Sequence, residues 1–170
     1  MKKSYVYLLT TFMLWGSLYV VSQFVLGKIP TFTVAMFRYL IAFIALSLIS
    51  LKTEKEKIEK SDYKYFFIMG FIGYFISVDC QLLGTKIAGG SMASLINSLN
   101  PVIISVMAMI ILNEKLEMNK IVGIVLSLAG VYMIIGTGAN IQFLGVLISF
   151  IAVIGWAFMS VISRKISNKY

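Results

Sequence analysis

Four polar side chains lie inside apolar stretches of this sequence, where burial in hydrocarbon costs free energy unless water, protein or a ligand meets each group. Arg38 and Asp79 carry opposite charges, and Tyr19 and Asn97 carry hydrogen-bonding groups. An Arg or Asp near the centre of a membrane helix costs about 2.5–3.5 kcal/mol, so such residues face the interior, water or one another. The chemistry open to this set is ion pairing, binding of a polar solute, or proton transfer.

The four residues lie in apolar stretches that are each long enough to cross a bilayer. A hydrocarbon core of about 30 Å requires about 20 residues of helix. The sequence predicts an all-α, polytopic transmembrane helical bundle of six helices. With 59% hydrophobic and 13% charged residues, the chain lacks the polar shell of a soluble domain. The predicted spans are 5–26, 31–51, 63–85, 91–112, 119–137 and 142–163.

The depth of the four side chains follows from a rise of about 1.5 Å per helical residue. Arg38 and Asp79 each lie about 10 Å from the outer end of a span, with Tyr19 and Asn97 at a similar level. Two interpretations of Arg38 and Asp79 remain open. They form either an ion pair that docks the second span on the third, or part of a substrate or proton pathway.

Asp79 and Gln81 point about 200° apart on one helix, so they cannot both line one cavity. One face of this helix meets a neighbouring helix and the other is available to a pathway, and the sequence does not say which. Gln81 shares its face with a stripe of small residues suited to close helix packing. The stripe consists of Gly70, Gly73 and Ser77.

The net charge of +8 is distributed as a topology signal. Twelve of the 15 basic residues fall on one side of the predicted bundle, and cytoplasmic loops carry such an excess. We therefore expect a multi-pass protein of the cell (plasma) membrane with a cytoplasmic N-terminus, and no binding of nucleic acid. The twelve are Lys2, Lys3, Lys52, Lys55, Lys57, Lys60, Lys64, Lys115, Lys120, Arg164, Lys165 and Lys169.

The sequence carries little that serves catalysis or metal binding. It has one cysteine, Cys80, and no histidine, which excludes a disulfide framework and any His-containing or multi-Cys metal site. No span holds paired acids or a nucleophile beside a base. We expect no enzyme activity, no metal and no cofactor.

The fourth span carries a stripe of polar and small residues around a proline. Pro101 removes a backbone hydrogen bond, which bends a helix and frees a carbonyl that protein or cavity water must satisfy. The stripe is either a packing seam or a cavity wall with a hinge, and both interpretations place it in the bundle interior. Trp15, in mid-span, serves either core packing or a ligand cavity. The stripe consists of Ser94, Asn97, Ser98, Pro101, Ser105 and Ala108.

The sixth span repeats features of the first. A shift of 141 residues aligns Trp15-Gly16 with Trp156-Ala157 and Ser22 with Ser163. An offset of five helices inverts the second copy, and inverted repeats are typical of secondary transporters. We predict a first five-helix repeat over 1–137 and the start of a second, inverted and truncated repeat over 141–170. Four helices would then be missing, and the chain would be a fragment.

Motifs in this order over residues 8–135 resemble the drug/metabolite transporter superfamily and its EamA-type members. The resemblance implies ten helices in two inverted repeats, cytoplasmic termini and a central cavity for small polar or amphipathic solutes. Such proteins work by alternating access, many as exporters of amino acids or other metabolites. Asp79 matches no family motif. The matching elements are Trp15-Gly16-Ser17, Ala35-x-x-Arg38-x-x-x-Ala42, Ser98-Leu-Asn-Pro101, Leu112-Asn-Glu114-Lys-Leu116, Gly123 and Gly130-Val131.

These observations predict a secondary transporter, an exporter of small metabolites such as amino acids or drugs. The expected partners are a small-molecule substrate, membrane lipid, and either a second copy of the chain or missing C-terminal helices. The alternative is a non-transporting structural or partner-binding membrane protein. The residues predicted to lie on the substrate pathway are Trp15, Tyr19, Arg38, Asp79, Asn97, Asn100 and Pro101.

Overall fold

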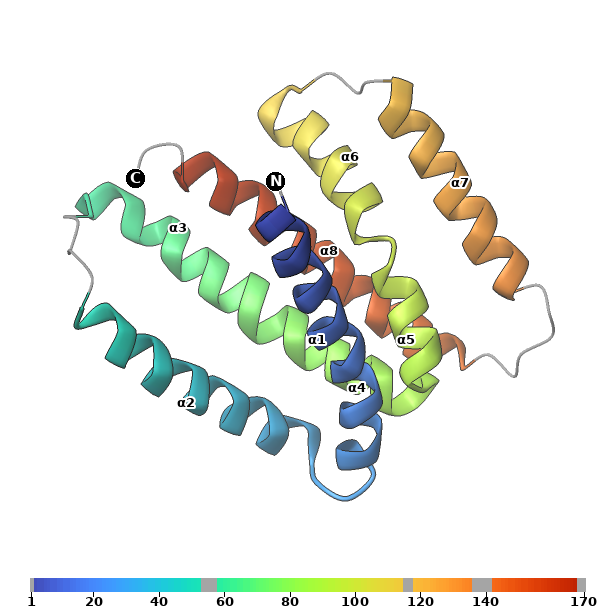
Figure 1. Cartoon of the computed structure of the whole chain (residues 1–170), viewed down its shortest axis with the longest axis horizontal. Coiled ribbons are helices and arrows are strands. Elements are labelled where there is room, and N and C mark those ends of the chain that lie inside the picture. The colour runs from blue at the N-terminus through green and yellow to red at the C-terminus, as the bar shows by residue number, and fades with distance from the viewer. Residues whose placement is uncertain (1, 53–57, 115–117, 136–141, 168–170) are drawn as a thin grey trace.

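The computed structural model describes residues 2–52, 58–114, 118–135 and 142–167, and every regular element in these ranges is helical (Figure 1). The predicted six-helix, all-α bundle is confirmed. The first two spans are α1 (Lys2–Leu26) and α2 (Thr31–Ser50). The third joins η1 (Lys60–Asp62), α3 (Tyr63–Ile68), the π-helix η2 (Met69–Ile76) and α4 (Ser77–Ala88). The remaining helices are α5 (Gly90–Asn97), α6 (Asn100–Leu112), α7 (Met118–Ile135) and α8 (Phe143–Ser167).

Five helical segments are long and apolar enough to cross a membrane, and the fifth span is shorter, at Met118–Met133. The last helix continues four residues past its predicted end, and Arg164 and Lys165 lie in its last turn. Basic residues suit this position, since a helix C-terminus attracts cations. The five long segments are Tyr5–Leu26, Thr31–Ser50, Lys60–Ala88, Gly90–Leu112 and Phe143–Ser167. Four of the predicted basic set, Lys55, Lys57, Lys115 and Lys169, lie outside the described residues.

Successive spans run in opposite directions, as the alternation of charge requires. Figure 1 shows the ends of α2, α6 and α8 along one edge of the bundle, and the α1–α2 and α4–α5 turns along the opposite edge. An ion pair joins two ends of that first edge. Arg164, in the last turns of α8, donates to both carboxylate oxygens of Glu114, after α6, at 3.0 and 3.2 Å. The pair is partly exposed and therefore contributes at most about 1 kcal/mol.

Small residues bring α8 into close antiparallel contact with η2 and α4. A Cβ atom placed on Gly145 would lie 2.6 Å from the backbone nitrogen of Ala88, which cannot move aside without moving α4. Further along the seam, Gly84 faces Ser149 with no room for a side chain. Membrane helices associate through such close backbone approach, because lipid removes the hydrophobic drive between apolar surfaces. We call these contacts the glycine seam; its pairs are Gly73–Met159, Ser77–Gly155, Gly84–Ser149 and Ala88–Gly145.

The glycine seam identifies the face of the third span that packs against a neighbouring helix. Gly73 and Ser77 of the predicted stripe contact α8, whereas a side chain on Gly70 would meet nothing within 4 Å. The π-helix explains this split, because its wider turns alter the helical phase between Gly70 and Ser77. Ser77 marks the return to α-helix, and its hydroxyl donates to the Ile72 carbonyl at 3.0 Å.

A small core closes the bundle where α1 and α2 meet α4. Buried Leu26 and Ala35 pack against Val78 and Leu82. Tyr39 of α2 extends this contact, since its hydroxyl donates to the backbone carbonyl of Tyr74 in η2 at 2.6 Å. The third span is thus held by α2 on one side and by α8 on another.

Candidate functional site

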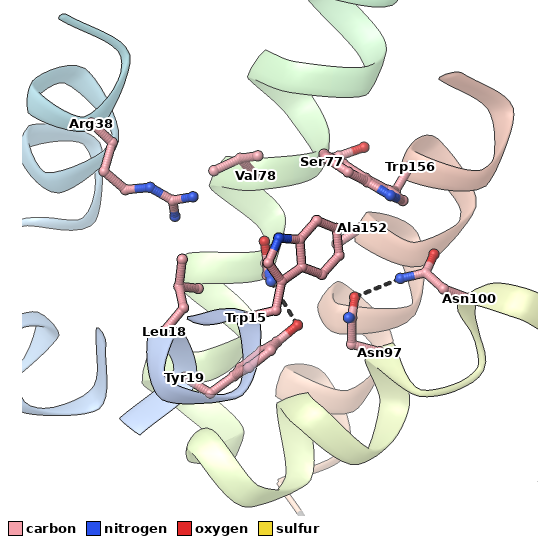
Figure 2. Close-up of a pocket in the computed structure, with 11 residues that line it drawn as sticks. Trp15, Leu18, Tyr19, Arg38, Ser77, Val78, Asn97, Asn100, Ala152 and Trp156 are labelled. Atoms are coloured by element: carbon pink, nitrogen blue, oxygen red, sulfur yellow. Dashed lines mark hydrogen bonds between the residues drawn. The ribbon is translucent and has the colours of Figure 1, made fainter. Parts of the chain in front are cut away.

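A cavity of about 100 Å³ lies where α1, α2, α4, α5, α6 and α8 converge (Figure 2). Five of the six spans contribute to its lining, and the described part of α7 contributes none. The residues that line the cavity are Trp15, Leu18, Tyr19, Arg38, Ser77, Val78, Gln81, Asn97, Asn100, Ala152 and Trp156.

Two tryptophans meet in this lining. The rings of Trp15 and Trp156 are 5.6 Å apart and edge to face, and Tyr74 packs edge to face on Trp156 at 5.9 Å. Edge-to-face pairs at this spacing are a favourable arrangement of aromatic quadrupoles. Trp15 and Trp156 are also the residues that the 141-residue shift aligns, so the two equivalent positions of the predicted repeat touch.

A hydrogen bond across the cavity joins the first span to the third. The side-chain amide of Gln81 donates to the hydroxyl of Tyr19 at 2.6 Å, and Tyr19 is only 7% exposed. The face of Gln81 therefore holds both the seam and the cavity wall, while Asp79 points elsewhere. Sequence reasoning noted that the face of Gln81 suits packing, left open which face borders a pathway, and did not predict Gln81 as a lining residue.

Removing this bond should weaken the fold measurably. Because a buried hydrogen bond contributes about 1 kcal/mol, Tyr19→Phe is expected to lower the midpoint of thermal unfolding in detergent. Tyr132→Phe is the matched control, since Tyr132 lies 78% exposed on α7. Equal midpoints for the two variants would show that the Tyr19 hydroxyl contributes nothing to stability.

The fourth span is interrupted at the cavity. Its helix stops at Asn97 and restarts at Asn100, with Ser98 and Leu99 in the turn between α5 and α6. Pro101 lies in the first turn of α6, where its missing N–H costs nothing. The bend expected at Pro101 is therefore an interruption of the helix just before this residue. Pro101 itself is exposed, so the expectation that the whole stripe faces the interior is wrong at Pro101 and at Ser98.

The break turns two asparagines toward the cavity. The Asn100 amide nitrogen donates to the Asn97 side-chain oxygen at 2.8 Å (Figure 2). The residue Asn100 is only 8% exposed, and its buried side-chain oxygen accepts no hydrogen bond. An orphaned acceptor of this kind loses its hydration without compensation, and a bound donor restores it.

Arg38 approaches the cavity from α2, and Figure 2 shows its guanidinium extending toward Val78. Its Nη1 atom is buried and has no hydrogen-bond partner. No other lining residue carries a formal charge. The cavity therefore offers one unused cationic donor and, at Asn100, one unused acceptor.

Asp79 does not belong to this lining. Neither of its carboxylate oxygens has a hydrogen-bond partner, so the ion pair with Arg38 considered from the sequence is not formed. The opposite-face argument for Asp79 and Gln81 explains the separation, because Gln81 takes the cavity side.

The structure brings together five of the seven residues predicted for the pathway: Trp15, Tyr19, Arg38, Asn97 and Asn100. Asp79 and Pro101 lie outside the lining. Six lining residues were not predicted, although the internal repeat pointed to Trp156 as the counterpart of Trp15: Leu18, Ser77, Val78, Gln81, Ala152 and Trp156. The role of these residues in transport stays a prediction.

Comparison with known proteins places the chain in a family. A model of the EamA-like transporter family matches residues 2–136. This chain belongs to that family. Over 96% of its length, the EamA-like chain is 28% identical to the uncharacterized transporter YetK of Bacillus subtilis (strain 168), of which it covers 52%. Over 97% of its length it is 27% identical to an uncharacterized transporter of Clostridium kluyveri, of which it covers 57%.

The EamA-like chain thus spans about half the length of the curated relatives it matches. No solved structure matches it. Family membership and five apolar spans make it a multi-pass membrane protein of a transporter family. One wall of the cavity, formed by Ala152 and Trp156 of α8, lies beyond the residues that the family model matches.

Proposed function

We propose that this chain works in a secondary transporter of the plasma membrane, with its N-terminus in the cytoplasm, that exports small metabolites such as amino acids or drugs. The cavity at the convergence of five spans is the solute site. The observation that carries the proposal is that two buried polar atoms of its lining residues, Nη1 of Arg38 and the side-chain oxygen of Asn100, have no hydrogen-bond partner. Transporters bind substrates near mid-membrane at interrupted helices, and the α5–α6 break borders this cavity.

The chemistry of the lining favours solutes with an anionic group. Arg38 supplies the single formal charge and a free Nη1 donor, and a guanidinium binds a carboxylate with favourable planar geometry. The free oxygen of Asn100 accepts from a donor on the same solute, while Trp15 and Trp156 cover its apolar part. Because Asp79 is outside the lining, the cavity has no acidic group to attract a cation.

Alternating access requires segments that change shape, and two irregular segments border the site. The turn at Ser98–Leu99 separates α5 from α6, and the π-helix η2 precedes α4. Helix interruptions and π-segments are frequent at functional hinges. Motion at these two places would open the cavity to one side of the membrane and then to the other.

Tryptophan fluorescence gives a direct binding assay, because both tryptophans of the chain line the cavity. Three matched ligands separate the charge requirements: an amino acid, its amide and the corresponding carboxylic acid. The two carboxylate-bearing ligands are expected to shift the emission, whereas the amide, a cation, is not. Proteoliposomes that contain the chain should then exchange the same carboxylates across the membrane.

The competing function, a structural or partner-binding membrane protein, predicts a different outcome. No ligand of the set would then alter the tryptophan emission, and no solute would cross the proteoliposome membrane. Preferential binding of the amide would contradict the assigned role of Arg38 while leaving transport intact.

A further inference from the structure

Asp79 is a buried carboxyl group to which the solute cavity assigns no role. It lies in the third span, is 8% exposed, and neither oxygen accepts a hydrogen bond. Of the other six acidic residues, Glu59 and Asp62 lie at the start of the third span and Glu114 follows α6, while Glu54, Glu56 and Glu117 lie outside the described residues.

The ionisable groups around Asp79 leave it without a partner. Cys80 follows Asp79 directly in α4, and Tyr39 of α2 contacts the π-helix that precedes α4. The Tyr39 hydroxyl is already donated to the Tyr74 carbonyl, and Arg38 points into the cavity. Tyr19 of α1 lies on the opposite side with Gln81, and the faces of α5 and α8 against α4 carry no ionisable residue.

An unpaired carboxylate in such a place is costly. Burial of an ionised group without a partner or hydrogen bonds takes so much free energy that the group neutralises instead. In lipid the remaining routes are a bound proton or a bound metal cation. The described residues hold no cluster of three or more His, Cys, Asp or Glu side chains that could bind a metal ion, so a single carboxyl group suits a proton. Intramembrane acids of this kind serve as proton relays in transporters.

The position of Asp79 links it mechanically to the solute site. Arg38 and Tyr39 are consecutive residues of α2, one reaching the cavity and the other holding η2 through the Tyr74 carbonyl. The π-helix η2 ends at Ile76, three residues before Asp79. A solute that displaces α2 through Arg38 would therefore also displace η2, the segment that leads into α4 and Asp79.

We propose that Asp79 is the proton-binding site that couples solute export to proton entry, separate from the solute cavity. In the conformation seen here the carboxyl group holds the proton. When α2 and η2 shift, Asp79 gains water or the guanidinium of Arg38 and releases that proton to the cytoplasm. It then takes one proton from the outer side, and no bond other than the O–H bond forms or breaks. The coupling rests on the proposed transport function, whereas the bound proton does not.

Infrared spectroscopy tests the proton without requiring any solute. The purified chain in lipid should show the carbonyl band of a protonated carboxylic acid that disappears at high pH. Asp79→Asn should remove this band, Asp79→Glu should retain it at a shifted frequency, and Glu114→Gln should leave it unchanged. Circular dichroism and the resting tryptophan emission show whether each variant is folded.

A transport measurement then tests the coupling. In proteoliposomes with an imposed proton gradient, Asp79→Asn is expected to lose gradient-driven accumulation of solute and to retain solute–solute exchange. A titrating band without any solute movement would refute the proposed function and keep the proton site. Absence of the band, or gradient-driven transport by Asp79→Asn equal to that of the unaltered chain, would overturn the inference.

Discussion

Replacing Arg38 by alanine is expected to weaken binding of carboxylate-bearing solutes by roughly 10- to 150-fold, because a hydrogen bond to a charged group contributes about 1.5–3 kcal/mol. The loss arises at the Nη1 atom, which has no other partner and lies in the cavity wall. Titration of the tryptophan emission measures it directly. Binding of an uncharged ligand of the same size should change little, since Trp15 and Trp156 remain in place.

Two further variants make this result specific. Arg38→Lys keeps the charge but not the planar fork, so we expect an intermediate affinity. Lys64→Ala removes an exposed cation at the start of the third span and should leave the affinity unchanged. Equal, mild effects of Arg38→Ala and Lys64→Ala would remove Arg38 from the solute site.

Gly145→Ala is expected to lower the stability of the bundle by about 1–3 kcal/mol, the usual cost of overpacking. The added methyl carbon would lie 2.6 Å from the backbone nitrogen of Ala88, so α8 must move away from α4. Thermal unfolding can be followed through the reactivity of Cys80, the one cysteine of the chain, which is half-buried on α4 itself. The variant should expose this thiol to a maleimide dye at a lower temperature.

Gly130→Ala is the matched control, because a Cβ at Gly130 of α7 meets nothing within 4 Å. Its unfolding midpoint should equal or slightly exceed that of the unaltered chain, since alanine favours helix. A midpoint for Gly145→Ala that matches Gly130→Ala would show that α8 does not depend on the glycine seam.

The spans were predictable because lipid imposes one requirement on each of them, a continuous apolar stretch with every backbone group bonded within its own helix. Local departures from the α-helix are not predicted by this requirement. The π-helix at Met69–Ile76 satisfies the backbone as an α-helix does, so hydropathy does not distinguish them. The helix break was easier to foresee, since Pro101 cannot donate the hydrogen bond that would continue the span.

The site was partly predictable for a related reason. Polarity inside an apolar span identified Arg38, Tyr19 and Asn97, whose side chains do meet in the cavity. The sequence did not predict whether Asp79 faces the cavity. Helical spacing gives the directions of side chains relative to one another within one helix, but it does not say which neighbouring helix packs against each face. That neighbour is α8, whose Gly155 and Ser149 fit against Ser77 and Gly84, and this fit exists only once both helices are present.

The glycine seam also orders the events of biosynthesis. Spans leave the ribosome from the N-terminus, so α1 to α6 reach the bilayer while the seam face of α4 still contacts acyl chains. The seam positions on that face carry only small residues, and they stay open to acyl chains until α8 is translated and covers them. The wall that carries Trp156 is consequently assembled after the walls formed by α1, α2, α4, α5 and α6.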